Sequence, residues 1–471
     1  MTKSINFVLN GQPKSANCRP DTTVLEWLRS EALLRGTKEG CAEGDCGACS
    51  VLVERPAVSG NQSNYQAANS CILLMGQLEG SAVMTVEGLA QTSADGHVIQ
   101  QRMAENGSSQ CGFCTPGIVV SLAGLLAEKQ SPNESEIHDA LAGNLCRCTG
   151  YRPIVEAAIS ATGELGHALP HAAQGDPKDF VGGDNEGTFH LPTKLDDLHS
   201  LREKFPDAIL LAGGTDISLD VAHARSRWQK TISTRDVTEL HVLDVIDDQL
   251  IVGGAVSWQA ALPHLEKYWP SFATLVRRFG STQIRSMGTI AGNLATASPI
   301  GDGAPSLIAL NSSITISNAE GERTIPLDRF FIDYRKCDLK RGEIIKSVNV
   351  PLPTPDQQFR AYKISKRYDQ DISTVCGAFS ISVKENVISN ACIAFGGMAA
   401  TPMRCTAAEE AVIGHKLDQT TLDTVKEAVA STFQPMSDVR GTADYRLLVA
   451  SNLIERLFLD LSGQAVEVMS L

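Results

Sequence analysis

Eight of the thirteen cysteines in this 471-residue chain form two groups near its N-terminus. In a reducing compartment, clustered cysteines more often bind metal than form disulfides. The first group is Cys41-x4-Cys46-x2-Cys49, completed by Cys71, and the second is Cys111-x2-Cys114, completed by Cys146-x-Cys148. The first spacing is the plant-type pattern for a [2Fe–2S] cluster, so the two groups together predict a two-cluster electron relay.

Structural zinc is the alternative for both groups. Four-cysteine zinc sites usually use two C-x2–4-C pairs, and the spacing of Cys146 and Cys148 is too tight for that pattern. Glycines at 40, 44 and 47 interleave with the first group, which lets the loop adopt positive φ and aim N–H groups at sulfur. We therefore expect iron–sulfur clusters. The other cysteines are scattered and are typical of small buried hydrophobes: Cys18, Cys337, Cys376, Cys392 and Cys405.

The bulk composition limits the possible partners. The chain is 43% hydrophobic and carries a net charge of −13, which favours globular domains and disfavours a nucleic-acid partner. The N-terminus has no apolar h-region, and the longest apolar-rich run, 118–127, is too short for a bilayer. We expect a cytoplasmic protein without a membrane span. We find no Ser-His-Asp or paired-carboxylate constellation and no H-E-x-x-H motif.

The first group of cysteines falls in a β-rich segment, and the second falls among helices. Alternating apolar residues over 5–9 and the turn Asn10-Gly11 predict a hairpin, followed by a capped helix over 24–29 and strands over 50–53 and 82–86. Helical patterns cover 118–128, 134–142 and 151–165. Gly143 is placed to end the second of these in a left-handed conformation, and Pro153 lies in the first turn of the third.

The rest of the chain mixes strands and helices. Residues 166–188 are rich in Gly, Pro and small polar residues and predict a linker. Beyond them, a helix over 194–204 precedes a strand over 208–212 that enters Gly213-Gly214-Thr215-Asp216, and a second strand covers 250–252. Residues 375–383 and 387–395 alternate as paired strands, and helices are expected over 422–433 and 443–461.

The sequence segments around the cysteines resemble the cluster loops of the molybdenum hydroxylase family. They are residues 40–49 (GCAEGDCGAC), 110–117 (QCGFCTPG) and 143–151 (GNLCRCTGY). Residues 211–216 (LAGGTD) and 288–293 (GTIAGN), continued by 297–302, resemble the family's two FAD-binding segments. The resemblance covers essentially the whole chain. Clusters and flavin on one chain resemble the small subunit of the bacterial xanthine dehydrogenase type.

The resemblance implies an α+β multidomain chain. We expect a plant-ferredoxin-like β-grasp domain over 1–90, a helical [2Fe–2S] domain over 91–165, the linker 166–188, a two-part α+β FAD-binding domain over 189–352 and a C-terminal α+β domain over 353–471. A strand ending in Gly-Gly-Thr can offer N–H groups to a pyrophosphate, but it is not the G-x-G-x-x-G of a Rossmann unit. A different FAD fold is therefore expected.

The resemblance also names the residues expected to line FAD. They are Leu210, Leu211, Ala212, Gly213, Gly214, Thr215, Asp216, Ile217, Phe279, Thr289, Ile290, Ala291, Gly292, Asn293, Asp302, Ile345 and Lys363. Asp302 would accept hydrogen bonds from the cofactor, and Phe279 would lie near the isoalloxazine ring. Taken alone, Phe279 is more typical of a core residue and Lys363 of a solvated surface lysine. Residues 366–372 resemble a loop near the flavin and the nicotinamide site, although Tyr368 and Gln370 depart from vertebrate relatives.

The function implied is electron transfer within a xanthine dehydrogenase. A molybdopterin-binding large subunit would oxidise hypoxanthine and xanthine to urate. Its electrons would pass through the helical-domain cluster, the plant-type cluster and FAD to NAD+, in a heterotetramer of two small and two large subunits. No catalytic residue for purine chemistry is expected in this chain. The alternatives are the equivalent subunit of a molybdenum hydroxylase acting on an aldehyde or an N-heterocycle, and a non-catalytic iron–sulfur/flavin redox sensor.

Overall fold

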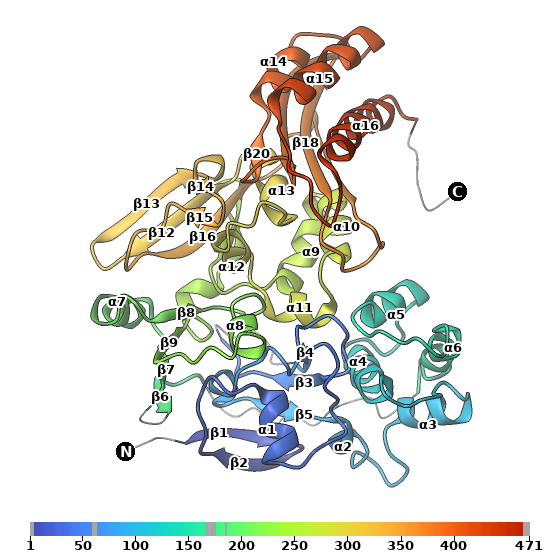
Figure 1. Cartoon of the computed structure of the whole chain (residues 1–471), viewed down its shortest axis with the longest axis vertical. Coiled ribbons are helices and arrows are strands. Elements are labelled where there is room, and N and C mark those ends of the chain that lie inside the picture. The colour runs from blue at the N-terminus through green and yellow to red at the C-terminus, as the bar shows by residue number, and fades with distance from the viewer. Residues whose placement is uncertain (1–3, 59–63, 165–168, 170–175, 184–185, 465–471) are drawn as a thin grey trace. The chain divides into compact units, whose positions relative to one another are not determined.

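The computed structural model describes residues 4–58, 64–164, 169, 176–183 and 186–464 (Figure 1). The backbone divides into two compact units, and each is assembled from several segments of the chain. The first unit comprises residues 1–241, 257–259 and 280–289, and the second comprises residues 242–256, 260–279 and 290–471. None of the helices in the described part of the chain is long and apolar enough to cross a membrane.

The first unit begins with a five-stranded sheet of order β2-β1-β5-β3-β4. Its strands are β1 (Ile5–Leu9), β2 (Gln12–Ala16), β3 (Ser50–Glu54), β4 (Gln66–Asn69) and β5 (Ala82–Met84). The predicted hairpin is confirmed, since Leu9 pairs with Gln12 across Asn10 and Gly11, which both have positive φ. Helix α1 (Val24–Ser30) begins at Thr23, whose hydroxyl accepts the Glu26 N–H, and the 3-10 turn η1 covers Met75–Leu78.

The helical part of the first unit gathers α3, α4, α5 and α6 (Figure 1). The elements are α2 (Val86–Leu89), α3 (Val98–Glu105), α4 (Thr115–Glu128), α5 (Glu134–Leu141) and α6 (Arg152–Ser160). Pro153 lies in the first turn of α6, as expected. The left-handed conformation expected at Gly143 is wrong, because Gly143 does not have positive φ. A Cβ there would lie 2.2 Å from Gln283 Oε1, so close packing requires this glycine.

A four-stranded sheet completes the first unit, with the order β6-β7-β9-β8. Its strands are β6 (Phe180–Gly183), β7 (Thr188–Leu191), β8 (Ile209–Leu211) and β9 (Lys230–Ser233), accompanied by α7 (Leu195–Lys204), α8 (Leu219–Ala222), η2 (Thr238–His241) and α11 (Thr282–Met287). Strand β6 lies inside the segment 166–188, for which we expected a linker. It forms because antiparallel pairing with β7 satisfies its backbone and buries Phe180 against Leu191. Residues 165–168, 170–175 and 184–185 lie outside the described residues.

The second unit contains a sheet of order β10-β11-β16-β12-β13. Its strands are β10 (Leu243–Ile246), β11 (Gln249–Gly253), β12 (Ser313–Asn318), β13 (Gly321–Pro326) and β16 (Ile344–Pro351), with the small pair β14 (Phe331–Asp333) and β15 (Lys336–Cys337). The helices of this region are α9 (Trp258–Tyr268), α10 (Pro270–Arg278), α12 (Ile290–Ala295), α13 (Gly303–Ala309) and the turn η3 (Leu327–Arg329). The first residues of α9 belong to the first unit.

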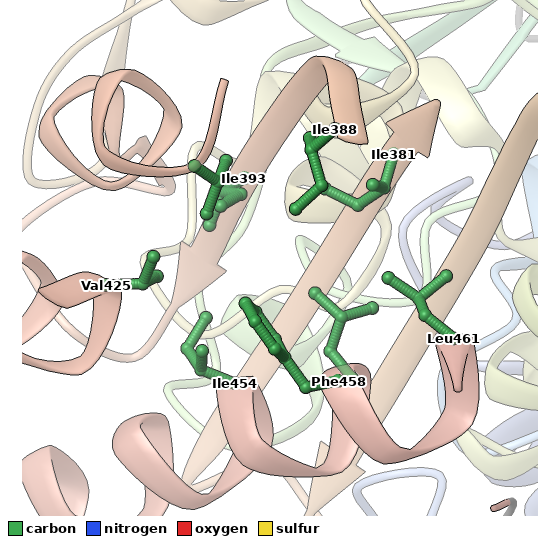
Figure 2. A pocket seen from close by; sticks show the side chains of 9 residues that line it. Ile381, Ile388, Ile393, Val425, Ile454, Phe458 and Leu461 are labelled. Atoms are coloured by element: carbon green, nitrogen blue, oxygen red, sulfur yellow. The ribbon is translucent and has the colours of Figure 1, made fainter. Parts of the chain in front are cut away.

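A second sheet of this unit, β17-β18-β19-β20, is covered by C-terminal helices (Figure 1). The strands are β17 (Gln357–Ile364), β18 (Val375–Lys384), β19 (Val387–Gly396) and β20 (Met403–Arg404), and the helices are α14 (Thr406–Val412), α15 (Gln419–Thr432) and α16 (Ala443–Leu461). Figure 2 shows apolar side chains of β18 and β19, among them Ile381 and Ile393, facing Ile454 and Phe458 of α16. The expected mixed α+β fold class is confirmed.

Candidate electron-transfer site

The first cysteine group lies in the loop between α1 and β3 and in the turn after β4. The side chains of Cys41 and Cys46 contact each other, and those of Cys49 and Cys71 form a second contacting pair. Cys49 and Cys71 are each 2% exposed, while Cys41 and Cys46 are half-buried. The fold therefore assembles the four expected ligands as two pairs.

Backbone N–H groups surround this group, as expected for a loop that binds charged sulfur. The N–H groups of Glu43 and Cys46 lie 3.4 Å and 3.3 Å from Cys41 Sγ, and the Cys41 N–H lies 3.3 Å from Cys46 Sγ. Contact with the Cys46 side chain, together with these N–H groups, lowers the pKa of Cys41 to about 4. The thiolate, which is the form that binds metal, is thus favoured at Cys41, while contact with Cys41 raises the pKa of Cys46.

The interleaved glycines are required by the geometry of the loop. Gly44 and Gly47 have φ of 85° and 67°, a region that L side chains adopt only at a cost. Gly40 has no such φ, but a Cβ there would lie 2.6 Å from Cys46 Sγ. Glycine is therefore needed at Gly44 and Gly47 for conformation and at Gly40 for space.

The second group lies at the ends of the helices in the same unit. Cys114 is the N-cap of α4, and Cys146 and Cys148 precede α6. The side chains pair as Cys111 with Cys148 and Cys114 with Cys146. Burial, followed by contact with Cys146, raises the pKa of Cys114 to about 12, despite its position at the N-terminus of α4. Cys111 and Cys148 are exposed, so this group reaches the surface of the unit.

In the second group, polar partners favour the thiolate at one member of each pair, Cys111 and Cys146, while the pKa of the other member, Cys148 or Cys114, is raised. The backbone N–H of Phe113, and then contact with Cys148, lower the pKa of Cys111. Burial opposes ionisation of Cys146, but the hydroxyl and backbone N–H of Thr149 outweigh it, and the Cys146 pKa is lowered. The hydroxyl of Thr149 lies 3.1 Å from Cys146 Sγ.

The paired arrangement suits a binuclear cluster better than a zinc ion. A structural zinc site holds four sulfurs about 2.3 Å from one point. Two thiolate pairs match the four-cysteine binding of two irons in a [2Fe–2S] cluster. The donor set of each group therefore fits this cofactor.

The two cysteine loops touch through their backbones. The Leu145 N–H donates to the Cys46 carbonyl at 2.9 Å, and Asn144 Nδ2 donates to the Gly47 carbonyl at 3.0 Å. Leu145 is covalently bonded to Cys146, so one hydrogen bond connects the chain segments of two candidate ligands. The two cysteine loops are therefore in direct contact.

A buried glutamine of the expected FAD-binding domain stabilises this junction, and no pattern in the sequence indicated it. Gln283 of α11 is 1% exposed, and its Nε2 donates to Asn144 Oδ1 at 2.9 Å and to Ser121 Oγ at 2.9 Å. Arg285 of the same helix is fully buried and forms an ion pair with Asp139 at 2.7 Å. These partners are more than 130 residues apart in sequence, so no local pattern indicated them.

The first unit also contains the Gly-Gly-Thr turn that was expected to bind flavin phosphates. The turn follows β8, and Gly214 has φ of 83°. A Cβ at Gly213 would lie 1.9 Å from the Met287 carbonyl oxygen, and a Cβ at Gly288 would lie 3.1 Å from Thr215 Oγ1. The two Gly-rich segments therefore pack side by side here. Glycine is therefore required at Gly213, because the neighbouring backbone occupies the position that a side chain would take.

The expected flavin residues 210–217 and Thr289 belong to the first unit, and the others belong to the second unit. Lys363 and Asp302 form a buried ion pair, and Ser373 Oγ contacts both, at 3.0 Å from Lys363 Nζ and 2.5 Å from Asp302 Oδ1. Lys363 is 4% exposed, so the structure does not support a solvated surface lysine. Asn293 Oδ1 is buried without a hydrogen-bond partner, which leaves an acceptor available for a bound group.

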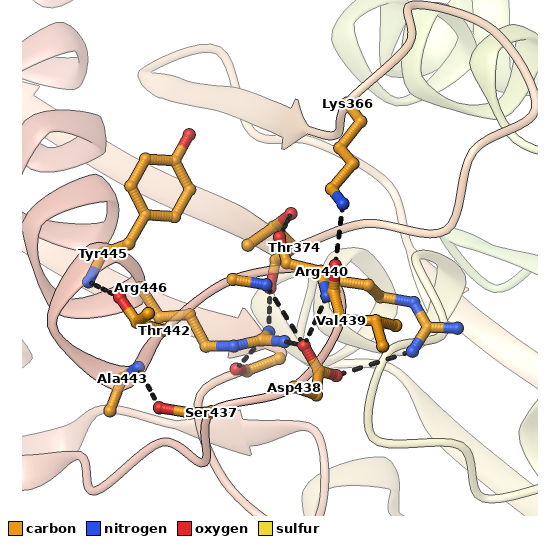
Figure 3. Close-up of polar contacts among 12 residues, drawn as sticks. Lys366, Thr374, Ser437, Asp438, Val439, Arg440, Thr442, Ala443, Tyr445 and Arg446 are labelled. Atoms are coloured by element: carbon orange, nitrogen blue, oxygen red, sulfur yellow. Dashed lines mark hydrogen bonds and ion pairs between the residues drawn. The ribbon is translucent and has the colours of Figure 1, made fainter.

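The remaining flavin candidates in that unit are placed on its strands and loops. Ile345 is a buried residue of β16, and Phe279 is half-buried at the end of α10, where it bridges Gln370 of the loop 366–372. That loop is anchored by Lys366, whose Nζ donates to the Val439 carbonyl at 2.8 Å (Figure 3). The loop is therefore held by its neighbours.

The segment that receives Lys366 is itself fixed by a buried arginine. Arg446 of α16 is 1% exposed and binds Asp438 at 2.6 Å, together with the carbonyls of Gly397 and Thr374 (Figure 3). Its two terminal nitrogens thus have carboxylate and carbonyl partners, which compensate the buried charge, while its Nε is buried without a hydrogen-bond partner. The loop that resembles a nicotinamide-site loop thus rests on a rigid support.

Comparison with known families accounts for nearly all of the chain. Residues 7–75 match a family described as 2Fe-2S iron-sulfur cluster binding domain, and residues 85–159 match one described as [2Fe-2S] binding domain. Residues 185–353 match the FAD binding domain in molybdopterin dehydrogenase. Residues 360–461 match the CO dehydrogenase flavoprotein C-terminal domain.

Curated relatives and solved structures agree with these matches. The xanthine dehydrogenase of Emericella nidulans is 32% identical over 98% of this chain and 39% of its own length, and xanthine dehydrogenase 1 of Arabidopsis thaliana is 31% identical over 93% and 38%. The chain thus spans about two fifths of these relatives. In fold alone, it is similar to a carbon monoxide dehydrogenase of Hydrogenophaga pseudoflava (TM-score 0.55, 24% identity, 57% of this chain and 94% of that one). It is similarly related to quinoline 2-oxidoreductase of Pseudomonas putida 86 (TM-score 0.54, 23% identity, 59% and 98%).

Proposed function

Because the chain belongs to the molybdenum hydroxylase family, whose iron–sulfur and flavin domains it carries, we propose that it is the electron-transfer part of a xanthine dehydrogenase. The curated relatives that match nearly its whole length are xanthine dehydrogenases, which supports this substrate class. A molybdopterin-binding partner chain oxidises the purine to urate, in an assembly of two small and two large subunits.

The eight paired cysteines hold two [2Fe–2S] clusters, and the Gly-rich segments, Asp302 and Lys363 hold FAD. The clusters supply one-electron carriers and the flavin supplies the two-electron step that NAD+ requires. Electrons enter at the helical-domain group, because its Cys111 and Cys148 are exposed beside Phe113 and Leu145, which are 47% and 45% exposed. They leave by way of the plant-type group and the flavin.

The observation that carries the proposal is the hydrogen bond from the Leu145 N–H to the Cys46 carbonyl. It joins the two cysteine loops within one compact unit, and Gln283, from the flavin segment, packs against the same junction. Two metal sites that served separate structural roles would not need this contact. A relay needs it, because electron transfer depends on a short route.

The test begins with the purified chain. Metal and flavin analysis should give about four iron, four sulfide and one FAD per chain, and NADH should reduce the protein to two distinct [2Fe–2S] EPR signals. Zinc in place of iron, or a protein that NADH leaves oxidised, would contradict the cluster and acceptor assignments respectively.

The substrate is tested with the co-purified partner chain. Xanthine should bleach the flavin of the complex under anaerobic conditions, and the isolated chain should not respond to xanthine. Reduction by an aldehyde or another N-heterocycle, with no response to xanthine, would keep the relay and assign the chain to another molybdenum hydroxylase. Reoxidation by NAD+ compared with oxygen identifies the acceptor.

A further inference from the structure

A buried glutamine of the iron–sulfur domain reaches the Gly-Gly-Thr turn of the flavin domain. Gln77 lies in η1, six residues after the candidate cluster ligand Cys71, and it is 0% exposed. Its Oε1 accepts the Leu74 N–H at 3.1 Å, and its Nε2 donates to the Gly213 carbonyl at 3.3 Å. One amide therefore connects the turn that follows Cys71 to the turn that follows β8.

The flavin domain also holds the other side of this 3-10 turn. The guanidinium of Arg235, which is 6% exposed and paired with Asp236, donates to the carbonyl of Gln77 and to that of Glu79 at 2.9 Å. A Cβ on Gly76 would lie 2.5 Å from the ring of Phe189 in β7. The backbone of η1 is thus held against the sheet of β6 to β9. The Cα atom from which the Gln77 side chain extends is therefore fixed in position.

The bond to Gly213 sets the direction of a peptide group. In a planar trans peptide, the C=O and the following N–H point in opposite directions. When Gln77 Nε2 holds the Gly213 carbonyl, the Gly214 N–H is aimed away from Gln77. Gly214 has φ of 83° and Gly213 has no room for a Cβ, so this stretch has glycine's conformational freedom and needs an external restraint.

We propose that Gln77 is a positioning residue that orients the Gly213–Gly214 peptide for the flavin pyrophosphate, so that FAD retention depends on a side chain of the iron–sulfur domain. The proposal rests on the proposed function, which places FAD at this turn. It adds that the plant-type cluster domain is part of the flavin-binding structure, beyond supplying electrons to it.

The main test variant is Gln77→Glu. Glutamate keeps an oxygen to accept the Leu74 N–H but replaces the Nε2 donor, so the change falls on the contact with Gly213. Asn10→Asp is the matched control, because Asn10 makes the same type of amide bridge in the same domain: its Oδ1 accepts the Thr85 N–H at 2.8 Å and its Nδ2 donates to Thr85 Oγ1 at 3.0 Å. Gln77→Met, which removes both hydrogen bonds, is the second variant.

Three measurements on the full-length chain decide the question. We expect Gln77→Glu and Gln77→Met to bind FAD about tenfold or more weakly, as the loss of one buried hydrogen bond predicts. The EPR signal of the plant-type cluster should keep its shape, and Asn10→Asp should bind FAD like the wild type. Hydrogen exchange of the Gly214 amide in apo-flavin protein should be faster in both Gln77 variants than in the wild type and the control.

The outcomes separate this proposal from the proposed function. An unchanged FAD Kd in Gln77→Glu overturns the positioning role, and so does weaker binding accompanied by loss of the cluster signal, because that pattern indicates general disruption of the domain. A wild-type chain that binds no FAD overturns the proposed function. Even in that case, hydrogen exchange of the Gly214 amide tests whether Gln77 orients the peptide. Equal exchange rates in wild type and variant overturn this role, and a faster rate in the variant supports it.

Discussion

Replacing Gly47 by alanine should separate the two cluster loops. Gly47 has φ of 67°, and a Cβ there would lie 2.1 Å from the carbonyl oxygen of Gly143, where real Cβ contacts are essentially never under 3.0 Å. Both groups belong to the backbone, so no side chain can rotate to relieve the clash. The loops have to move apart, and the bonds of Asn144 to the Gly47 carbonyl and of Leu145 to the Cys46 carbonyl have to lengthen.

The expected loss follows from these contacts. An alanine in the left-handed region costs about 1 kcal/mol, and each broken hydrogen bond contributes about 1 kcal/mol, or more where a buried group is left unpaired. A total near 3 kcal/mol should lower the Tm of a unit of this size by roughly 6–12 °C. Gly112→Ala is the matched control, because Gly112 follows a candidate ligand, has φ of 81° and has nothing within 4 Å of an added Cβ. Its Tm should fall by only roughly 2–4 °C.

The assay combines thermal unfolding by circular dichroism with iron content and EPR of the reduced protein. Gly47→Ala should lower the Tm and weaken the magnetic interaction between the two cluster signals. Gly112→Ala should retain its iron content and the magnetic interaction. If Gly112→Ala lowers Tm as much as Gly47→Ala, the left-handed conformation alone explains the effect. If Gly47→Ala keeps the wild-type Tm and interaction, the loops do not touch as described.

Three further substitutions test separate parts of the molecule. Cys148→Ser should remove one of two EPR signals and leave FAD bound; loss of both signals would contradict two separate cluster sites. Asp302→Asn should lower Tm and flavin content while sparing the clusters, because Lys363, with its side chain 1% exposed, loses its partner, and such a loss costs about 3–5 kcal/mol; unchanged flavin content would place Asp302 outside the site. Glu343→Gln should reduce the loss of Tm that occurs at acid pH. Hydrogen bonds from Arg323 lower the pKa of Glu343, so its stabilisation is present above the ordinary carboxyl pKa and disappears as pH falls through the lowered value; equal Tm losses between about pH 7 and about pH 3 in variant and wild type would refute this.

Local patterns in the sequence predicted several of the helices and strands. The hairpin at Asn10-Gly11, the Thr23 cap and the pairing of β18 with β19 all formed as expected, because each depends on residues within a few positions of one another. Helix α6 ends at Ser160, although the pattern suggested Leu165, and β6 formed in a segment that looked like a linker. In β6 the deciding partner is a neighbouring strand, which a local window does not include. The expected domain boundaries, ligands and flavin contacts stay predictions.

The sequence by itself determined the expected chemistry of this protein, because cysteine spacing and interleaved glycines are local requirements of a cluster loop. Long and specific sequence motifs also carry the family resemblance. Only the tertiary structure decided how the parts of the relay connect. The pairing of Cys111 with Cys148, the hydrogen bond from Leu145 to Cys46 and the hydrogen bond from Gln77 to Gly213 join residues that are distant in the chain. A buried polar group must find a partner wherever the packed chain offers one, and that partner is selected by the fold and leaves no signal in the neighbouring sequence.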